Sequence, residues 1–153
     1  MANEAYRAVF LRVHPTGKMV LSLTTEADGR EAEYAELTAG ELGVPPLDVK
    51  VVPADTNRFG VGHGFNSSPS EGASAAIVSA AGKIRAKAQL LAGMALGEAP
   101  DRLTWSNGAW VAGDGSDPGQ MRTVADVALY AYGSGELPRG VEGGLDAQAV
   151  YTD

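Results

Sequence analysis

The chain has 153 residues, a length that predicts one domain over 1–153 with a single hydrophobic core. No apolar run reaches the roughly 20 residues needed to cross a bilayer, so membrane insertion is not expected. The net charge of −7 argues against nucleic acid as a partner. With no cysteine in the sequence, disulfides, thiolate zinc sites and cysteine-ligated iron–sulfur clusters within this chain are excluded.

The first residues do not show the basic segment and apolar core of a secretory signal, so we expect a cytoplasmic protein. The two histidines, His14 and His63, lie far apart in the sequence, with no carboxylate at metal-ligand spacing beside either. We therefore expect no metal site made by protein ligands alone.

The first half of the chain predicts a β-β-α-β unit. Apolar and polar residues alternate over 6–13 and 19–24, on either side of a His-Pro-Thr-Gly turn, which indicates a β-hairpin. From residue 28 the apolar period becomes helical, and Gly43 with the proline at 45 ends a helix predicted over 29–43. The valine-rich segment 48–53 predicts the next strand.

A glycine-rich loop from Phe59 to Gly64 follows that strand and leads into an alanine-rich helix predicted over 70–97. Glycines let backbone N–H groups turn toward a ligand, and a helix start adds unpaired donors and partial positive charge. This loop is therefore the strongest candidate site, and it suits an anion. The predicted core stripe of the helix contains Ile77, Ala80, Ala81, Ile84, Ala88, Leu91 and Met94.

The remaining segments predict a second hairpin, a short helix and a final strand. The pair Asn107-Gly108 predicts a hairpin over 103–112, with Trp105 opposite Trp110. Thr123 is expected to cap a helix over 124–132. Residues 149–151 indicate a strand with no partner inside this segment, which we expect to pair with another chain or with another part of a larger protein. The predicted fold class is α+β, with two-layer β-β-α-β units and one long alanine-rich helix.

Several short motifs occur in a fixed order along nearly the whole chain. They are His-Pro-Thr-Gly-Lys at 14–18, Gly-Glu-Leu-Gly-Val-Pro at 40–45, Ala-Asp-Thr at 54–56, Gly-Val-Gly-His at 60–63 and Ala-Ala-Gly-Lys-Ile-Arg-Ala-Lys-Ala at 80–88. In this order they resemble the large subunit of molybdenum hydroxylases, the family of carbon monoxide dehydrogenase, aldehyde oxidase and xanthine dehydrogenase. The resemblance implies part of a region that binds molybdopterin, often as its cytosine dinucleotide.

In that family two loops clasp the cofactor, and they map to residues 27–33 and 60–68 here. The cofactor-binding residues that the resemblance implies are Asp28, Gly29, Arg30, Gly62, His63, Gly64, Phe65, Asn66, Ser67 and Ser68. The first loop departs from the family pattern, because the carboxylate of Asp28 replaces a glutamine amide and cannot donate a hydrogen bond when ionised. Arg30 either pairs with a phosphate or is a solvated residue at a helix start. The second loop is one residue shorter and lacks the family's arginine.

The family's activated glutamate falls outside this segment, so the chain cannot hold a complete active site. The resemblance implies a small subunit or fragment of a split molybdenum hydroxylase-like oxidoreductase that shares molybdopterin with a larger molybdopterin-binding subunit. Iron–sulfur and flavin subunits would relay electrons. One alternative is a structural subunit that completes the partner's fold without touching the cofactor. Another is a subunit of a molybdopterin hydratase, lyase or transhydroxylase, with Asp28, Glu31 or His63 as acid or base.

Overall fold

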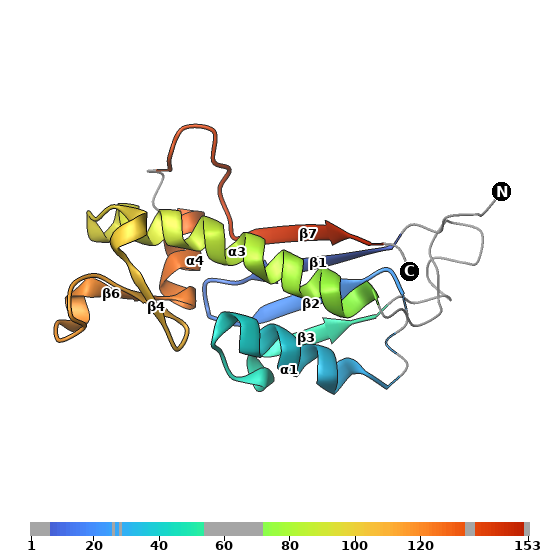
Figure 1. Ribbon diagram of the computed structural model, residues 1–153. Coiled ribbons are helices and arrows are strands. Elements are labelled where there is room, and N and C mark those ends of the chain that lie inside the picture. The colour runs from blue at the N-terminus through green and yellow to red at the C-terminus, as the bar shows by residue number, and fades with distance from the viewer. Residues whose placement is uncertain (1–6, 26, 28, 54–71, 134–136, 152–153) are drawn as a thin grey trace.

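The computed structural model describes residues 7–25, 27, 29–53, 72–133 and 137–151 (Figure 1). The α+β class and the one long helix are confirmed. Within the described residues no helix is long and apolar enough to span a membrane. The helices and strands, in chain order, are β1 (Ala8–Val13), β2 (Met19–Leu23), α1 (Glu31–Leu42), β3 (Val49–Val52), α3 (Gly72–Leu96), β4 (Thr104–Ser106), β5 (Ala109–Val111), β6 (Met121–Thr123), α4 (Val124–Gly133) and β7 (Asp146–Val150).

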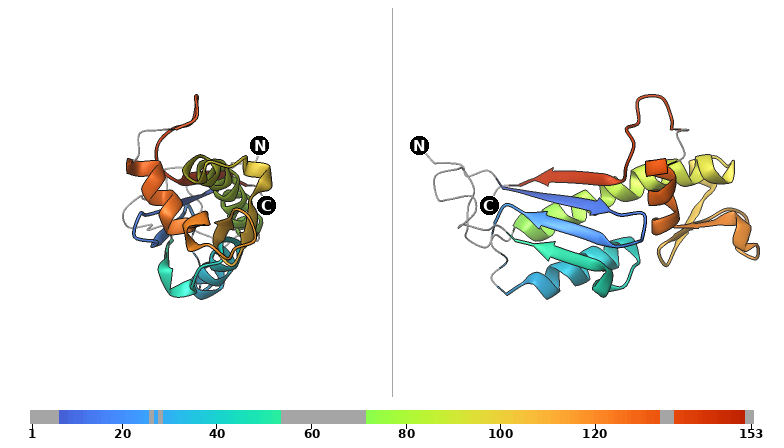
Figure 2. Two further views of the ribbon diagram at one scale, coloured as in Figure 1. Left: turned by 90° about the vertical axis from the view of Figure 1, so that its left-hand side faces the viewer. Right: turned by 180° about the vertical axis from the view of Figure 1, so that it is seen from behind.

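The main body is a four-stranded sheet in the order β3-β2-β1-β7, with α1 and α3 side by side on one face (Figures 1 and 2). Strand β1 runs antiparallel to β2 and β7, whereas β2 and β3 are parallel and joined through α1. Alternate strand residues such as Val9, Leu11 and Leu21 point toward the helices and are buried. They pack against the predicted core stripe of α3. The prediction that Met94 belongs to this stripe is wrong, because Met94 is 45% exposed.

The predicted final strand is present, but the expectation that it lacks a partner within the chain is wrong. β7 pairs with β1 in antiparallel register, with Ala8 opposite Val150 and Arg12 opposite Asp146. The ammonium group of Lys83 in α3 also donates a 2.7 Å hydrogen bond to the Gln148 carbonyl of β7. The first and last strands of the described chain are therefore neighbours in one sheet, and β7 does not need a strand from another polypeptide.

A second, three-stranded sheet stands at the far end of α3. β4 and β5 form the predicted hairpin, and the rings of Trp105 and Trp110 lie 4.4 Å apart across it. Trp110 is 1% exposed and belongs to the core. The guanidinium of Arg85 lies 5.0 Å from the Trp105 ring centre, so this cation stacks on an aromatic ring. The third strand, β6, was not predicted from the sequence.

The turn of this hairpin rests directly on the end of α1. Gly43 caps α1 in the left-handed conformation with a φ of 68°, and Gly108 in the turn has a φ of 80°. A Cβ on Gly43 would lie 2.7 Å from the Gly108 Cα and 3.0 Å from the carbonyl carbon of Asn107. Both residues therefore have to be glycine for two backbones to meet at this distance.

Candidate functional site

One edge of the four-stranded sheet gathers the ends of several elements. β2 and β3 are parallel and end there, with Ser22 opposite Val52 near the edge. α1 and α3 both begin at this edge, as Figure 1 shows. Helix starts carry unpaired N–H groups and partial positive charge, and ligands of sheets with parallel strands bind beyond the carboxyl ends of those strands. We call this end of the sheet, where β2 and β3 terminate, the carboxyl edge; the name does not refer to an outer strand.

The described part of the first predicted loop forms a tight turn at the carboxyl edge. The Arg30 N–H donates to the Ala27 carbonyl at 2.9 Å, and Gly29 between them takes a φ of 82°. Arg30 is the residue before the first turn of α1, and its carbonyl accepts from the N–H of Tyr34 at 2.9 Å. The turn thus holds the half-buried Arg30 at the helix start, while Asp28 lies outside the described residues.

The charges around the start of α1 are mixed. Glu31 and Glu33 occupy its first turn and are exposed. Their carboxylates interact favourably with the partial positive charge of the helix start, and they would repel a bound anion. Arg30 is the cation beside them. By contrast, the first turn of α3 from Gly72 onward contains no acidic residue, although Glu71 precedes it in the sequence. Of the two helix starts, that of α3 offers the less negative described surface.

The second predicted loop cannot be placed, because Gly62, His63, Gly64, Phe65, Asn66, Ser67 and Ser68 all lie outside the described residues. Their assignment as cofactor-binding residues stays a prediction. The described residues on either side are Pro53 after β3 and Gly72 at the start of α3. β3 ends and α3 begins at the carboxyl edge, where α1 also begins (Figure 1). The described chain therefore enters and leaves both predicted loops at the same edge.

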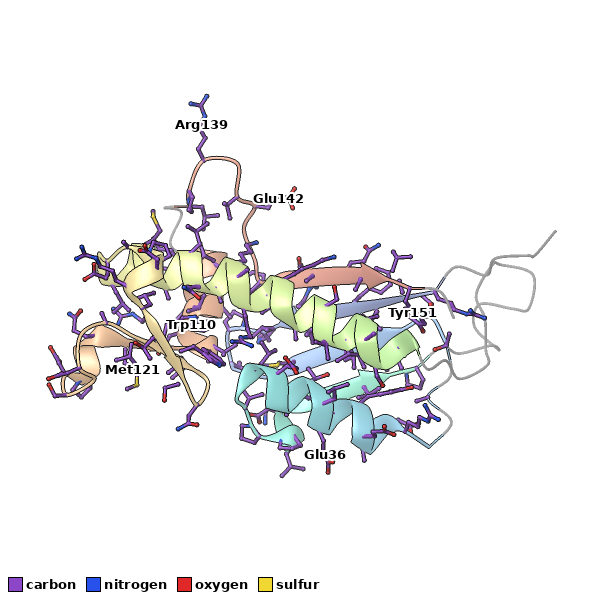
Figure 3. The ribbon with its side chains drawn as sticks, in the orientation of Figure 1. Glu36, Trp110, Met121, Arg139, Glu142 and Tyr151 are labelled. Carbon is purple, nitrogen blue, oxygen red and sulfur yellow. The ribbon has the colours of Figure 1, made fainter. Side chains whose placement is uncertain are left out.

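The structure brings three further residues to this edge that the sequence did not single out. The hydroxyl groups of Thr25 and Tyr151 lie 3.2 Å apart, and both side chains are buried. The N–H of Tyr151 donates to the Arg7 carbonyl at 3.0 Å, and Figure 3 shows Tyr151 at this end of the molecule. The first loop is thus anchored, just after β2, to the chain that leaves β7. Only a contact between residues 126 positions apart reveals this.

The described residues suit an anionic group better than a bare metal. No three His, Asp or Glu side chains gather to hold a metal ion in the part of the chain that the structure describes. A guanidinium is a donor that suits a phosphate, whereas the Arg30 N–H in this turn already donates to the Ala27 carbonyl. A Cβ on Gly29 would meet no atom within 4 Å, so the turn borders open space. Arg30, at the start of α1, is therefore the described residue at this edge whose chemistry suits a phosphate.

The pKa of Asp114, which is remote from the carboxyl edge, is clearly shifted. Asp114 lies in the segment between β5 and β6, where the side chain and then the backbone N–H of Ser116 donate hydrogen bonds to its carboxylate. These bonds stabilise the charged form and lower the pKa of Asp114. The side chain is fully exposed and makes no contact with the candidate site.

Comparison with known proteins assigns this architecture to a family. A family model described as a molybdopterin cofactor-binding domain matches residues 1–153. The chain is 37% identical over 147 residues to the carbon monoxide dehydrogenase large chain of Hydrogenophaga pseudoflava, covering 92% of this chain and 17% of that protein. The corresponding large chain of Afipia carboxidovorans is 35% identical over 147 residues, with the same two shares.

Two solved structures agree with this comparison. A Cu,Mo-CO dehydrogenase in its carbon monoxide reduced state has a TM-score of 0.78 and 30% identity, covering 96% of this chain and 18% of that chain. Quinoline 2-oxidoreductase from Pseudomonas putida 86 has a TM-score of 0.71 and 28% identity, covering 95% of this chain and 19% of that chain. The chain thus spans less than a fifth of the length of each of these relatives.

Proposed function

Because this chain belongs to the family of molybdopterin cofactor-binding domains and corresponds to a segment of a molybdenum hydroxylase large subunit, we propose that it supplies part of the binding site for a molybdenum cofactor. The rest of the site comes from a larger molybdopterin-binding polypeptide. The carrying observation is that the described flanks of both predicted loops, 27–33 and 60–68, meet at the carboxyl edge. Such an edge can hold a ligand between two loops that are far apart in sequence.

In this proposal the chain binds and orients the cofactor and performs no complete reaction alone. Arg30 contacts one oxygen of the cofactor's pyrophosphate. The other pyrophosphate oxygens accept hydrogen bonds from the backbone amides of Gly62 and Gly64 and from the hydroxyls of Ser67 and Ser68. We propose the cytosine dinucleotide form of the cofactor. When bound, the cofactor supplies the redox chemistry of an oxidoreductase, while this chain contributes position and electrostatics. Subunits with iron–sulfur and flavin centres would relay the electrons.

A second function is a structural subunit that completes the partner's fold without touching the cofactor. The exposed carboxylates of Glu31 and Glu33 favour it, because they lie beside Arg30 in the first turn of α1 and weaken anion binding there. In this case Arg30 serves mainly to offset the two carboxylates. The two functions differ in whether residues at the carboxyl edge control the cofactor content of the assembly.

The test is to purify the untagged assembly that contains this chain from its native source and to measure molybdenum and released pterin nucleotide. We expect both in amounts stoichiometric with the chain. The base of the released nucleotide decides whether the cofactor is the cytosine form. An assembly without molybdenum, or a chain that elutes alone and without it, would refute the proposal.

Two matched substitutions separate cofactor binding from the structural function. Arg30→Gln is expected to lower the molybdenum content per chain severalfold, because it removes a charged donor from the carboxyl edge. Arg139→Gln is the control, since this exposed arginine lies on the loop before β7, away from that edge (Figure 3). If neither Arg30→Gln nor a combined Ser67→Ala and Ser68→Ala change alters the cofactor content, the structural function is favoured.

A further inference from the structure

One face of the four-stranded sheet is uncovered by any described helix or strand. α1 and α3 both lie on the opposite face, as the view from behind in Figure 2 makes clear. We propose that the uncovered face docks against the remainder of the large-chain polypeptide. The inference rests on the proposed function only for the identity of this occupant. The surface itself is defined by the residues described next.

The uncovered face consists of alternate residues from all four strands, aligned in rows by the strand register. One row runs from Val52 through Ser22 and Phe10 to Gln148. The next row runs from Lys50 through Val20 and Arg12 to Asp146. Beyond the first row, Val150 lies opposite Ala8, which is itself buried, so the exposed part of β1 begins at Phe10. Since side chains alternate between faces, all of these outward side chains belong to one surface.

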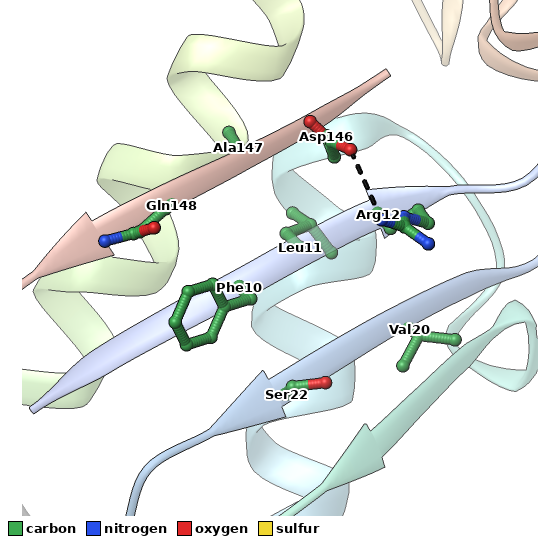
Figure 4. A pocket seen from close by; sticks show the side chains of 8 residues that line it. All are labelled: Phe10, Leu11, Arg12, Val20, Ser22, Asp146, Ala147 and Gln148. Carbon is green, nitrogen blue, oxygen red and sulfur yellow. Dashed lines mark ion pairs between the residues drawn. The ribbon is translucent and has the colours of Figure 1, made fainter. Parts of the chain in front are cut away.

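This surface has the composition of a protein interface. Phe10, Val20, Val52 and Val150 are 38%, 39%, 39% and 61% exposed, so four large apolar side chains meet solvent on one face. Charged residues stand at the end of the second row, where Arg12 and Asp146 approach to 3.6 Å. A hollow over β2, β1 and β7 separates Phe10 from this ion pair (Figure 4). The face thus combines exposed apolar side chains with charged and polar ones, a mixture that surfaces binding another protein also have.

The apolar residues of this face come from neighbouring strands of one mixed sheet. All-parallel sheets are covered on both faces and antiparallel strands tolerate one solvated face; this sheet contains one parallel pair and two antiparallel pairs. The parallel pair β2–β3 contributes Val20 and Val52 to the uncovered face. The most exposed large apolar residue of the described chain is different, because Leu47, at 95%, stands on the turn before β3. Single residues of that kind are ordinary on protein surfaces.

The occupant follows from the length of the relatives. This chain corresponds to only 17% of a carbon monoxide dehydrogenase large chain, so in such a protein more than four fifths of the polypeptide lies outside the segment and has to pack against it. The carboxyl edge provides contact with a cofactor but little apolar area. The uncovered face, which lies beside that edge, provides the apolar area that a stable association needs.

The experiment uses the large-chain polypeptide of the same organism as the probe, co-expressed with a tagged form of this chain. Val20→Lys puts a charge at the centre of the uncovered face, and we expect it to reduce the amount of large-chain polypeptide that co-elutes by at least about tenfold. Leu47→Lys adds the same charge on an exposed turn and is expected to leave co-elution unchanged. Equal co-elution of the two variants would overturn the proposal.

Chemical labelling of amines gives a second measurement that requires no substitution. Lys50 lies on the uncovered face, whereas Lys18 lies in the turn between β1 and β2. We expect labelling of Lys50, relative to Lys18, to slow severalfold in the assembly. An unchanged ratio would contradict docking, and protection of Lys50 in the chain alone, eluting as a dimer, would show that a second copy is the occupant instead.

The molybdenum content of the same samples separates failure of this inference from failure of the proposed function. An assembly that forms, protects Lys50 and contains no molybdenum supports docking and refutes cofactor binding. An assembly that contains molybdenum while Lys50 labels freely supports cofactor binding and refutes docking by this face.

Discussion

The contact between Gly43 and Gly108 predicts that Gly43→Ala strongly destabilises the fold. The added methyl group would lie 2.7 Å from the Gly108 Cα and 3.0 Å from the Asn107 carbonyl carbon. Both are backbone atoms, so no side-chain rotation relieves the overlap, and α1 and the hairpin have to move apart. The left-handed φ of 68° adds the strain of any residue with a Cβ in that region.

Strain of about 1 kcal/mol for the left-handed residue and about 2 kcal/mol for the overlap give a total of about 3 kcal/mol. For a domain of this size that loss lowers the Tm by about 6–12 °C. The assay is thermal unfolding together with urea unfolding, in which the midpoint should fall while the slope stays unchanged.

Gly40→Ala is the matched control within the same helix. A Cβ at Gly40 would meet no atom within 4 Å, and replacing glycine inside a helix is expected to raise stability by about 0.5–1 kcal/mol. If Gly43→Ala melts within about 2 °C of the parent protein, the close approach of α1 and the hairpin turn is not present in solution, and the reasoning fails.

Two smaller perturbations test other contacts by urea unfolding. Tyr151→Phe removes the 3.2 Å contact with the buried hydroxyl of Thr25 and should lower the free energy of unfolding by about 1–2 kcal/mol. A much smaller decrease would argue against the anchor. So would the absence of a partial recovery in stability when Thr25→Val is added. Thr123→Ala should cost about 1 kcal/mol, because the Thr123 hydroxyl accepts from the Asp126 N–H at 3.1 Å while the Asp126 carboxylate accepts from the Thr123 N–H at 2.9 Å. An unchanged midpoint would show that this cap does not stabilise α4.

Local signals in the sequence were sufficient for most elements. The change from a two-residue to a helical apolar period located β1, β2 and α1, and the Asn-Gly pair located the hairpin of β4 and β5. The threonine before α4 was identified as its cap, which the bonds to Asp126 confirm. These features depend on residues within a few positions of one another, so composition and spacing are enough to indicate them.

Pairing between strands that are distant in the sequence was harder to predict. The prediction that the last strand lacks a partner failed because β1 and β7 lie at opposite ends of the chain. The three-residue β6 carries too short an apolar pattern to stand out, and it is recognised only by its pairing with β5. Met94 was assigned to the buried stripe of α3, but it is 45% exposed while Leu91 and Ala92 beside it are buried, so it lies off that stripe.

For the candidate site, the sequence predicted two cofactor-binding loops and indicated a molybdenum cofactor, because glycines, hydroxyl residues and motif order are local and ordered features. It could not show that the described flanks of both loops meet at one edge, or that Thr25 and Tyr151 anchor the first loop there. The glycines at 43 and 108 appeared in the sequence as a helix stop and a turn, whereas the folded chain uses both to bring two backbones together. The sequence by itself determined the elements and their chemistry, since those depend on neighbouring residues. Only the tertiary structure decided which distant residues touch and which sheet face the described helices leave uncovered, because those depend on how the elements pack.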